Sequence, residues 1–301
     1  METIELCETG DVILVPGYPA TKRFQVSSVV LANASPVFGA MFSGRYTEGQ
    51  GLSSAAPKVI TLEEDEECSL EIMLRLIHLR PKDVDNLMTT GQGPAVATLC
   101  DKYDTLPVLR QTIGLWLTQA AQLDAGGCDN ANDLCNLCAT AFISGNTKSF
   151  EVLTNKVATT ETASFCNFIK SGKHALPPRI FAALDELREE CRSTLRSNMN
   201  EFIGGVNRYN CTCSYDYDSR EIARLFLAIE TCSVVDAVEK MLSFIERNQD
   251  PPFSPCAISH GARTASSTGR EGLKSLRSST TNYIKAMMRN VKGLSLAEMR
   301  A

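Results

Sequence analysis

Hydrophobic and polar positions follow two different periods along the first eighty residues. The runs Val12–Val15 and Val59–Leu62 are rich in β-branched residues, and Phe24 and Val26 alternate with polar neighbours. The first pattern is typical of a buried strand, and the second is typical of a strand that is buried on one face. From Ser28 the apolar residues recur every three or four positions, as on one face of a helix. These periods predict a small sheet followed by helices.

Pro36 interrupts the helical pattern. Proline lacks a backbone donor and restricts the preceding residue, here Ser35, to extended backbone. We therefore expect two short helices, with Ser35 as the N-cap of the second and Pro36 in its first turn. After the strand at residues 59–62 we expect an acidic loop at Glu63–Glu67 and then an apolar helix over Leu70–Leu79.

After Leu106 the apolar residues keep the helical period almost throughout, which predicts an all-α region. One continuous stripe runs from Ile180 to Val206, and we expect Gly204–Gly205 to end that helix. The other expected helices cover about 108–123, 134–142, 150–157, 165–169, Ser219–Glu230, Ser233–Arg247 and Leu273–Val291. Prolines and glycines between Gln249 and Gly272 predict an exposed loop.

The first part of the chain carries a series of motifs in one order, at Asp11, Phe24, Val26, Val30, Leu31, Ser35, Pro36, Phe38, Met41, Phe42, Ile60, Leu62 and the segment Cys100–Tyr103. This order of motifs resembles the BTB/POZ domain family. In one position the chain departs from the family, because Ser27 stands where the family usually has histidine. The layout, with its long helical tail, looks most like the BTB proteins of fungi.

The resemblance implies an α+β N-terminal BTB/POZ-like domain, a small sheet flanked by helices, followed by an all-α C-terminal region. We place the BTB/POZ-like domain at residues 1–122 and a helical extension at 123–175. A C-terminal helical region follows at 176–301, with a Pro/Gly/Ser-rich loop at about 249–272. Members of the family are binding modules, so the expected function is protein–protein interaction and not catalysis.

Charge is distributed unevenly along the chain. Residues 1–122 carry 9 Lys and Arg against 15 Asp and Glu, whereas residues 251–301 carry 8 against 2. The acidic first part argues against nucleic-acid binding there, and we interpret the basic end as the solvated face of the last helix. No apolar run of about 18 residues is present, so we expect no membrane span. The first residues lack a basic start and an apolar core, so we expect no signal peptide.

The sequence offers little that could act as a catalytic centre. Only three histidines are present, and we interpret His78 as a packed helix residue and His174 as a solvated one. No nucleotide-binding, metalloprotease or hydrolase motif is found. We therefore expect no enzymatic activity and no cofactor. Twelve cysteines without a signal peptide indicate reduced thiols in an intracellular protein, in the cytoplasm or the nucleus.

Two cysteine patterns have the spacing of metal ligands. Cys135 and Cys138 form a C-x-x-C pair, but they lie on an apolar helix face, which favours buried free thiols. Cys211, Cys213, Cys256 and His260 could together complete a tetrahedral zinc site. The gap of 42 residues between the two pairs makes this a weak pattern, and unlinked thiols with a solvated histidine are the favoured interpretation.

The strongest functional candidate is the segment after the S-P-x-F helix. In BTB adaptors that recruit cullin scaffolds, this segment carries a hydrophobic-x-acidic motif, and Tyr46 and Glu48 occupy that place here. With Phe42 they form the expected partner-binding site. The alternative interpretation is that this segment is an ordinary surface loop without a binding role. The implied function is an adaptor, with a cullin-based ubiquitin ligase as its candidate complex.

The second functional class is a transcription or chromatin co-regulator with a BTB domain for self-association and a basic tail for nucleic acid. Family dimers often use a strand ahead of the domain. Thr3–Leu6 is the segment available for such a strand, so a homodimer is a further candidate partner state. The two classes differ in what they predict, because only the second requires salt-sensitive DNA binding by the tail.

Overall fold

The computed structural model describes most of the chain as two compact units. The described residues are 1–80, 84, 88–123, 131–165, 168, 175–209, 219–247 and 267–301. The first unit holds Met1–Leu153, Lys173–Pro177 and Ser295–Ala301, and the second holds Thr154–Gly172 and Pro178–Leu294. This division follows contacts within the chain, whereas the boundaries at 122 and 175 come from the resemblance and stay a prediction.

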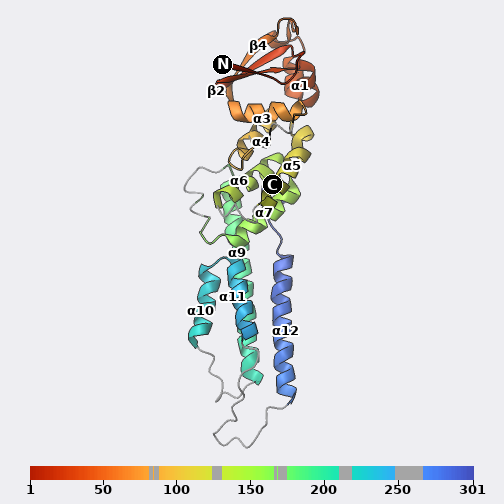
Figure 1. The fold of residues 1–301 in the computed structure, drawn as a ribbon. Coiled ribbons are helices and arrows are strands. Elements are labelled where there is room, and N and C mark those ends of the chain that lie inside the picture. The colour runs from red at the N-terminus through yellow and green to blue at the C-terminus, as the bar shows by residue number, and fades with distance from the viewer. Residues whose placement is uncertain are drawn as a thin grey trace, which may run out of the picture. The chain divides into compact units, whose positions relative to one another are not determined.

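The first unit begins with a four-stranded sheet (Figure 1). The strands are β1 (Glu2–Glu5), β2 (Val12–Tyr18), β3 (Lys22–Val26) and β4 (Lys58–Glu66), in the order β1-β3-β2-β4. β2 runs antiparallel to β3 and parallel to β4, and β1 runs parallel to β3 of the same chain. The three strands expected from the sequence are confirmed. A homodimer built on β1 stays a prediction.

The expected acidic loop at Glu63–Glu67 is wrong, because β4 continues through it to Glu66. Ile60 and Leu62 are buried, Glu63 and Glu64 are both exposed, and Asp65 is buried, so the alternation of side chains shifts by one residue where the pairing of β4 with β2 is irregular. Asp65 is buried and its carboxylate lies 2.8 Å from Lys102 Nζ, with a second hydrogen bond from the Tyr103 hydroxyl. The buried charge is therefore paired, which lets an acidic sequence form an edge strand.

β2 also extends beyond its expected end and passes through Pro16 and Gly17 to Tyr18. The pairing of β2 with β4 shifts register between Pro16 and Tyr18. A Cβ atom on Gly17 would lie 1.8 Å from the carbonyl oxygen of Glu63. Only glycine fits this close approach of two backbones, so Gly17 marks the point on β2 that faces the extra residues of β4.

The two short helices expected around Pro36 are confirmed as α1 (Ser28–Ala34) and α2 (Pro36–Met41). Ser35 caps α2, since its Oγ accepts a hydrogen bond of 3.0 Å from the Phe38 amide. The same hydroxyl donates to the Tyr103 carbonyl at 2.5 Å. Phe38 and Leu31 are fully buried, as the apolar period predicts.

The rest of the first unit is helical. Its further helices are α3 (Glu67–Ile77), α4 (Gly93–Lys102), α5 (Leu106–Leu123), α6 (Ala131–Ser144), the start of α7 (Thr147–Thr160) and α13 (Leu296–Arg300). A Cβ atom on Gly93 would lie 2.5 Å from Thr140 Oγ1, so α4 and α6 approach closely there. The guanidinium of Arg300 lies over the Phe142 ring and donates to the carbonyls of Phe142 and Ile143. These contacts dock α13, a helix that the sequence pattern does not predict.

The second unit contains the long helix α9 (Pro178–Tyr209) together with α10 (Ser219–Thr231), α11 (Val234–Arg247) and α12 (Ser267–Asn290) (Figure 1). The apolar stripe of α9 is buried among them. The core that they form together includes Leu195, Met199, Phe202, Ile229, Met241, Phe244 and Ile284. The Phe202 and Phe244 rings meet edge to face with centroids 6.5 Å apart. The stripe therefore packs inside the chain, as amphipathic helices usually do.

Two helix boundaries in this unit differ from expectation. α9 does not end at Gly204–Gly205 but continues to Tyr209, because Gly205 serves packing: a Cβ there would lie 2.5 Å from Leu276 Cδ2 of α12. α12 begins at Ser267, so residues 267–272 of the expected loop are helical. The remainder of that loop, and the expected break at Gly126–Gly127, lie outside the described residues.

Candidate partner-binding surface

Residues 42–51, here called the partner loop, follow α2 and are folded back on themselves. Gly44 and Gly51 have φ angles of 77° and 69°, a conformation that favours glycine. A Cβ on Gly49 would lie 2.6 Å from the Gly44 nitrogen, so these backbone segments are in contact. Lys58 Nζ on β4 donates to the Gln50 carbonyl at 3.0 Å and to the Thr47 carbonyl. The partner loop is therefore held in one shape by its glycines and by a lysine.

An aromatic stack joins the partner loop to the core. The ring of Phe42, the C-cap of α2, stacks on Phe38 with centroids 5.9 Å apart, and Phe38 stacks on Tyr103 at 4.4 Å. Burial and the hydrogen bond to Asp65 raise the pKa of Tyr103, so its hydroxyl stays a donor. The start of the loop thus rests on a fixed, buried base.

The three expected partner-binding residues all lie in the partner loop. Tyr46 is 56% exposed and directly precedes a single 3-10 turn, Thr47–Gly49. Glu48 is half-buried and accepts a hydrogen bond of 3.1 Å from the Thr47 hydroxyl. Phe42 is half-buried under its stack with Phe38. The loop can therefore present an aromatic ring and a carboxylate together, and their role in binding stays a prediction.

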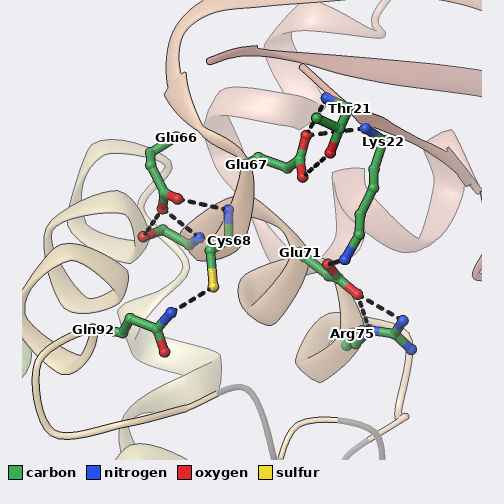
Figure 2. Close-up of polar contacts among 9 residues, drawn as sticks. Thr21, Lys22, Glu66, Glu67, Cys68, Glu71, Arg75 and Gln92 are labelled. Carbon is green, nitrogen blue, oxygen red and sulfur yellow. Dashed lines mark hydrogen bonds and ion pairs between the residues drawn. The ribbon is translucent and has the colours of Figure 1, made fainter. Parts of the chain in front are cut away.

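A second polar cluster fixes α3 against the hairpin of β2 and β3 (Figure 2). Glu66 caps α3 and accepts hydrogen bonds from the amides of Cys68 and Ser69 at 2.9 and 2.7 Å. Glu67 accepts three hydrogen bonds, from the amides of Thr21 and Lys22 at 2.5 and 3.0 Å and from the Thr21 hydroxyl at 2.7 Å. Burial works to raise the pKa of Glu67, but these bonds outweigh it and hold the pKa below its ordinary value.

Glu71, one turn further along α3, completes this cluster. Its side chain is 3% exposed, and its carboxylate lies 2.7 Å from both Lys22 Nζ and Arg75 Nη2. The hydrogen bond to Glu71 raises the pKa of Lys22, so the Lys22 ammonium keeps its proton. All these carboxylates accept from fixed donors, which makes the cluster a structural clamp. We call it the α3 clamp, and its residues are Thr21, Lys22, Glu66, Glu67, Glu71 and Arg75. The sequence gives no signal for it, because Thr21 and Glu67 are 46 positions apart.

His78 occupies the C-cap of α3 and contacts the start of α1. Its Nδ1 lies 2.9 Å from the Leu74 carbonyl, and its Nε2 lies 3.2 Å from the Ser27 amide, which donates to it. Both contacts are satisfied only by the neutral ring with its proton on Nδ1. An imidazole from α3 therefore lies against Ser27, the position where the family usually has its own histidine.

This geometry predicts a pH-dependent stability. Burial lowers the pKa of His78 below its ordinary value of 6.5, so the unfolded chain takes up the proton first as the pH falls. The free energy of unfolding is then expected to decrease as the pH falls below about 6.5. Above that pH the stabilising contribution of neutral His78 is fully retained. The His78→Gln variant should lack this part of the decrease. Urea unfolding of both proteins between pH 5 and 8 measures it, and parallel curves would contradict the assignment.

The cysteine patterns are only partly covered by the structure. Cys135 and Cys138 are buried in α6, as expected for core thiols. Cys211, Cys213, Cys256 and His260 lie outside the described residues, as does His174, so the zinc site stays a prediction. Within the described ranges, no group of three or more His, Cys, Asp or Glu side chains could hold a metal ion. In the same ranges no helix is long and apolar enough to cross a membrane.

Comparison with known families identifies the first part of the chain. Residues 2–112 match the family model of the BTB/POZ domain, which covers the sheet, the partner loop and the α3 clamp. Comparisons with curated proteins and with solved structures gave no match. BTB/POZ domains mediate protein–protein interactions and dimerisation and are typically non-enzymatic, which supports an adaptor role. The chain therefore carries an N-terminal BTB/POZ domain over residues 2–112.

Proposed function

We propose that this protein is a protein–protein interaction adaptor that serves as a substrate receptor of a cullin-based ubiquitin ligase. The observation that carries the proposal is the shape of the partner loop. It exposes Tyr46 beside Glu48 at the place where ligase adaptors of the family carry their hydrophobic-x-acidic motif. The BTB/POZ domain supports the interaction role, and the loop supplies the candidate contact with the scaffold.

The chemistry of the contact follows from the two side chains. The Tyr46 ring is large and has few rotatable bonds, so it can fill an apolar pocket of the scaffold at a small entropic cost. Glu48 can pair with a cation or a hydroxyl group at the rim of that pocket. Because glycines, Lys58 and the Phe42–Phe38 stack already hold the partner loop, little ordering remains to be done on binding. The helical region after residue 122 is then the part that recruits the substrate.

The double variant Tyr46→Ala, Glu48→Ala tests the contact. We expect it to weaken binding to a purified cullin-type scaffold at least about tenfold, which corresponds to roughly 1.4 kcal/mol. Its free energy of unfolding should change by no more than about 0.5 kcal/mol, as for other surface substitutions. Calorimetric titration gives the affinity, and urea unfolding gives the stability.

Tyr18→Ala is the matched control, since Tyr18 is also an exposed tyrosine of the same domain, at the end of β2. This variant should bind the scaffold as the parent does. Equal binding by the double variant and the parent, or no binding by the parent, would remove the ligase proposal. Equal losses in the double variant and in Tyr18→Ala would place the contact elsewhere on the domain.

The co-regulator function has one observation in its favour. Four exposed cations follow one another on and just after α12: Lys274, Lys285, Arg289 and Lys292. No ion pair joins any of them to another residue within the described part of the chain. If they contact phosphates, Lys285→Glu, Arg289→Glu should weaken duplex DNA binding and reduce its salt dependence. If the parent and the variant bind duplex DNA equally and salt does not change their binding, the charged face of α12 is simply solvated.

A further inference from the structure

Cys232 and Lys240 form a close pair of sulfur and ammonium in the second unit. Cys232 follows α10 and directly precedes Ser233, whose hydroxyl accepts a hydrogen bond of 3.0 Å from the Asp236 amide at the start of α11. Lys240 lies two turns along α11. Its Nζ donates to Cys232 Sγ across 2.9 Å. The pair thus brings a nucleophilic atom and an amine into direct contact.

The backbone of Cys232 is anchored on two helices. Its amide donates to the Ala228 carbonyl of α10 at 2.9 Å, and its carbonyl accepts a hydrogen bond of 3.2 Å from Arg192 Nη2 of α9. The corner between α10 and α11 is therefore fixed, and Lys240 reaches the sulfur from a third helix. This arrangement keeps the two reactive atoms together without a rearrangement of the chain.

Small solutes can reach the pair. Cys232 is half-buried and Lys240 is exposed, and Lys240, though not Cys232, also lines a surface hollow of about 430 Å³ between α10 and α11. Arg224, Asp236 and Arg247 also line this hollow. The hydrogen bond with Cys232 raises the pKa of Lys240, so the amine approaches the sulfur as an ammonium.

The other cysteines of the described residues lack this combination. Cys100, Cys135, Cys138 and Cys191 are buried, and burial raises the pKa of Cys100 to about 11. Cys68 is half-buried, but burial and the carboxylate of Glu66 raise its pKa, and its sulfur contacts the neutral amide of Gln92. Cys7 has a hydroxyl contact only, with Thr9 at 3.6 Å. Reactive cysteines lie in accessible surroundings near cations, and Cys232 meets both conditions.

We propose that the Cys232–Lys240 pair is a site of oxidative modification by hydrogen peroxide. The sulfur attacks one peroxide oxygen, so an S–O bond forms as the O–O bond breaks and sulfur loses two electrons. The departing hydroxide takes a proton from the Lys240 ammonium and leaves as water, and the thiol proton passes to solvent. The amine then attacks the sulfenic sulfur, a second water leaves, and an S–N bond joins the two residues. In total one thiol, one ammonium and one peroxide give one S–N link, two waters and one proton.

Peptide mapping of the full chain after brief exposure to hydrogen peroxide tests the site. We expect a peptide in which Cys232 and Lys240 are joined with the loss of two hydrogens, together with lost trypsin cleavage after Lys240. Dithiothreitol should restore both. Oxidation of Cys232 should be at least about tenfold faster than that of Cys68, because an accessible sulfur next to a cation reacts first.

Two variants separate the steps. Lys240→Met should form no link, should oxidise more slowly at Cys232, and should carry a sulfenic acid that dimedone captures. Cys232→Ser should show neither the link nor capture at this position. Lys240 is exposed and Cys232 is half-buried, and circular dichroism verifies that the helices persist in both variants. Equal oxidation rates at Cys232 and Cys68, or the same rate in Lys240→Met as in the parent, would overturn the proposal.

Discussion

Replacing Gly17 by alanine is expected to destabilise the protein by about 3 kcal/mol or more. The added Cβ would lie 1.8 Å from the carbonyl oxygen of Glu63 and 2.4 Å from its carbonyl carbon. These are backbone atoms of the paired strand β4, so they cannot move aside as a flexible side chain would. The bulge between β2 and β4 must open instead, and the inward position of Asp65 would be disturbed with it. Urea unfolding monitored by circular dichroism measures the loss.

Gly204→Ala is the matched control for this prediction. Gly204 lies inside α9, and a Cβ there would meet no atom within 4 Å. Alanine favours helix over glycine, so this variant should gain up to about 1 kcal/mol. A Gly17→Ala protein as stable as the parent would show that the close approach of β2 and β4 does not exist in solution.

Phe38→Ala is expected to cost about 3–5 kcal/mol, the range for removing a buried phenylalanine ring. Phe38 is fully buried in α2 and lies between Phe42 and Tyr103 in the aromatic stack. Its loss removes the support under the partner loop as well as part of the core. We therefore expect weaker scaffold binding in addition to lower stability, although Phe38 itself is buried away from any partner.

Phe38→Leu separates the two effects. Leucine fills most of the same volume, so its cost should stay near about 1.5 kcal/mol, but it cannot stack on Phe42. Binding should then be weakened while the domain remains folded at the temperature of the titration. If Phe38→Leu binds the scaffold as well as the parent, the stack does not position the partner loop.

The elements that sequence predicted correctly are those whose cause is local. Ser35 caps α2 and Pro36 begins it because both preferences arise within four residues of chain. Strand positions such as Phe24 and Val26 follow from alternation, and the buried stripe of α9 follows from a period of 3.6 residues. The partner loop was located through its place in a family pattern, and its exposure at Tyr46 is read from the structure.

The features that sequence did not predict have distant causes. The acidic run could become β4 only because Lys102 and Tyr103, nearly forty positions later, satisfy Asp65. A Gly-Gly pair is typical of a helix end, yet Gly205 makes room for Leu276 of another helix. The contact of His78 with Ser27 joins residues 51 positions apart. In each case the residue that determines the local structure is brought close by tertiary packing. Local sequence preferences carry no information about such distant contacts.

The most direct test of the central claim is hydrogen–deuterium exchange on the full chain, with and without a purified cullin-type scaffold. We expect slower exchange in peptides that cover the partner loop, residues 42–51. Peptides that cover Tyr18 and the α3 clamp should keep their rates. Protection confined to other parts of the BTB/POZ domain, or no protection at saturating scaffold, would contradict the assignment of Phe42, Tyr46 and Glu48 as the partner-binding residues.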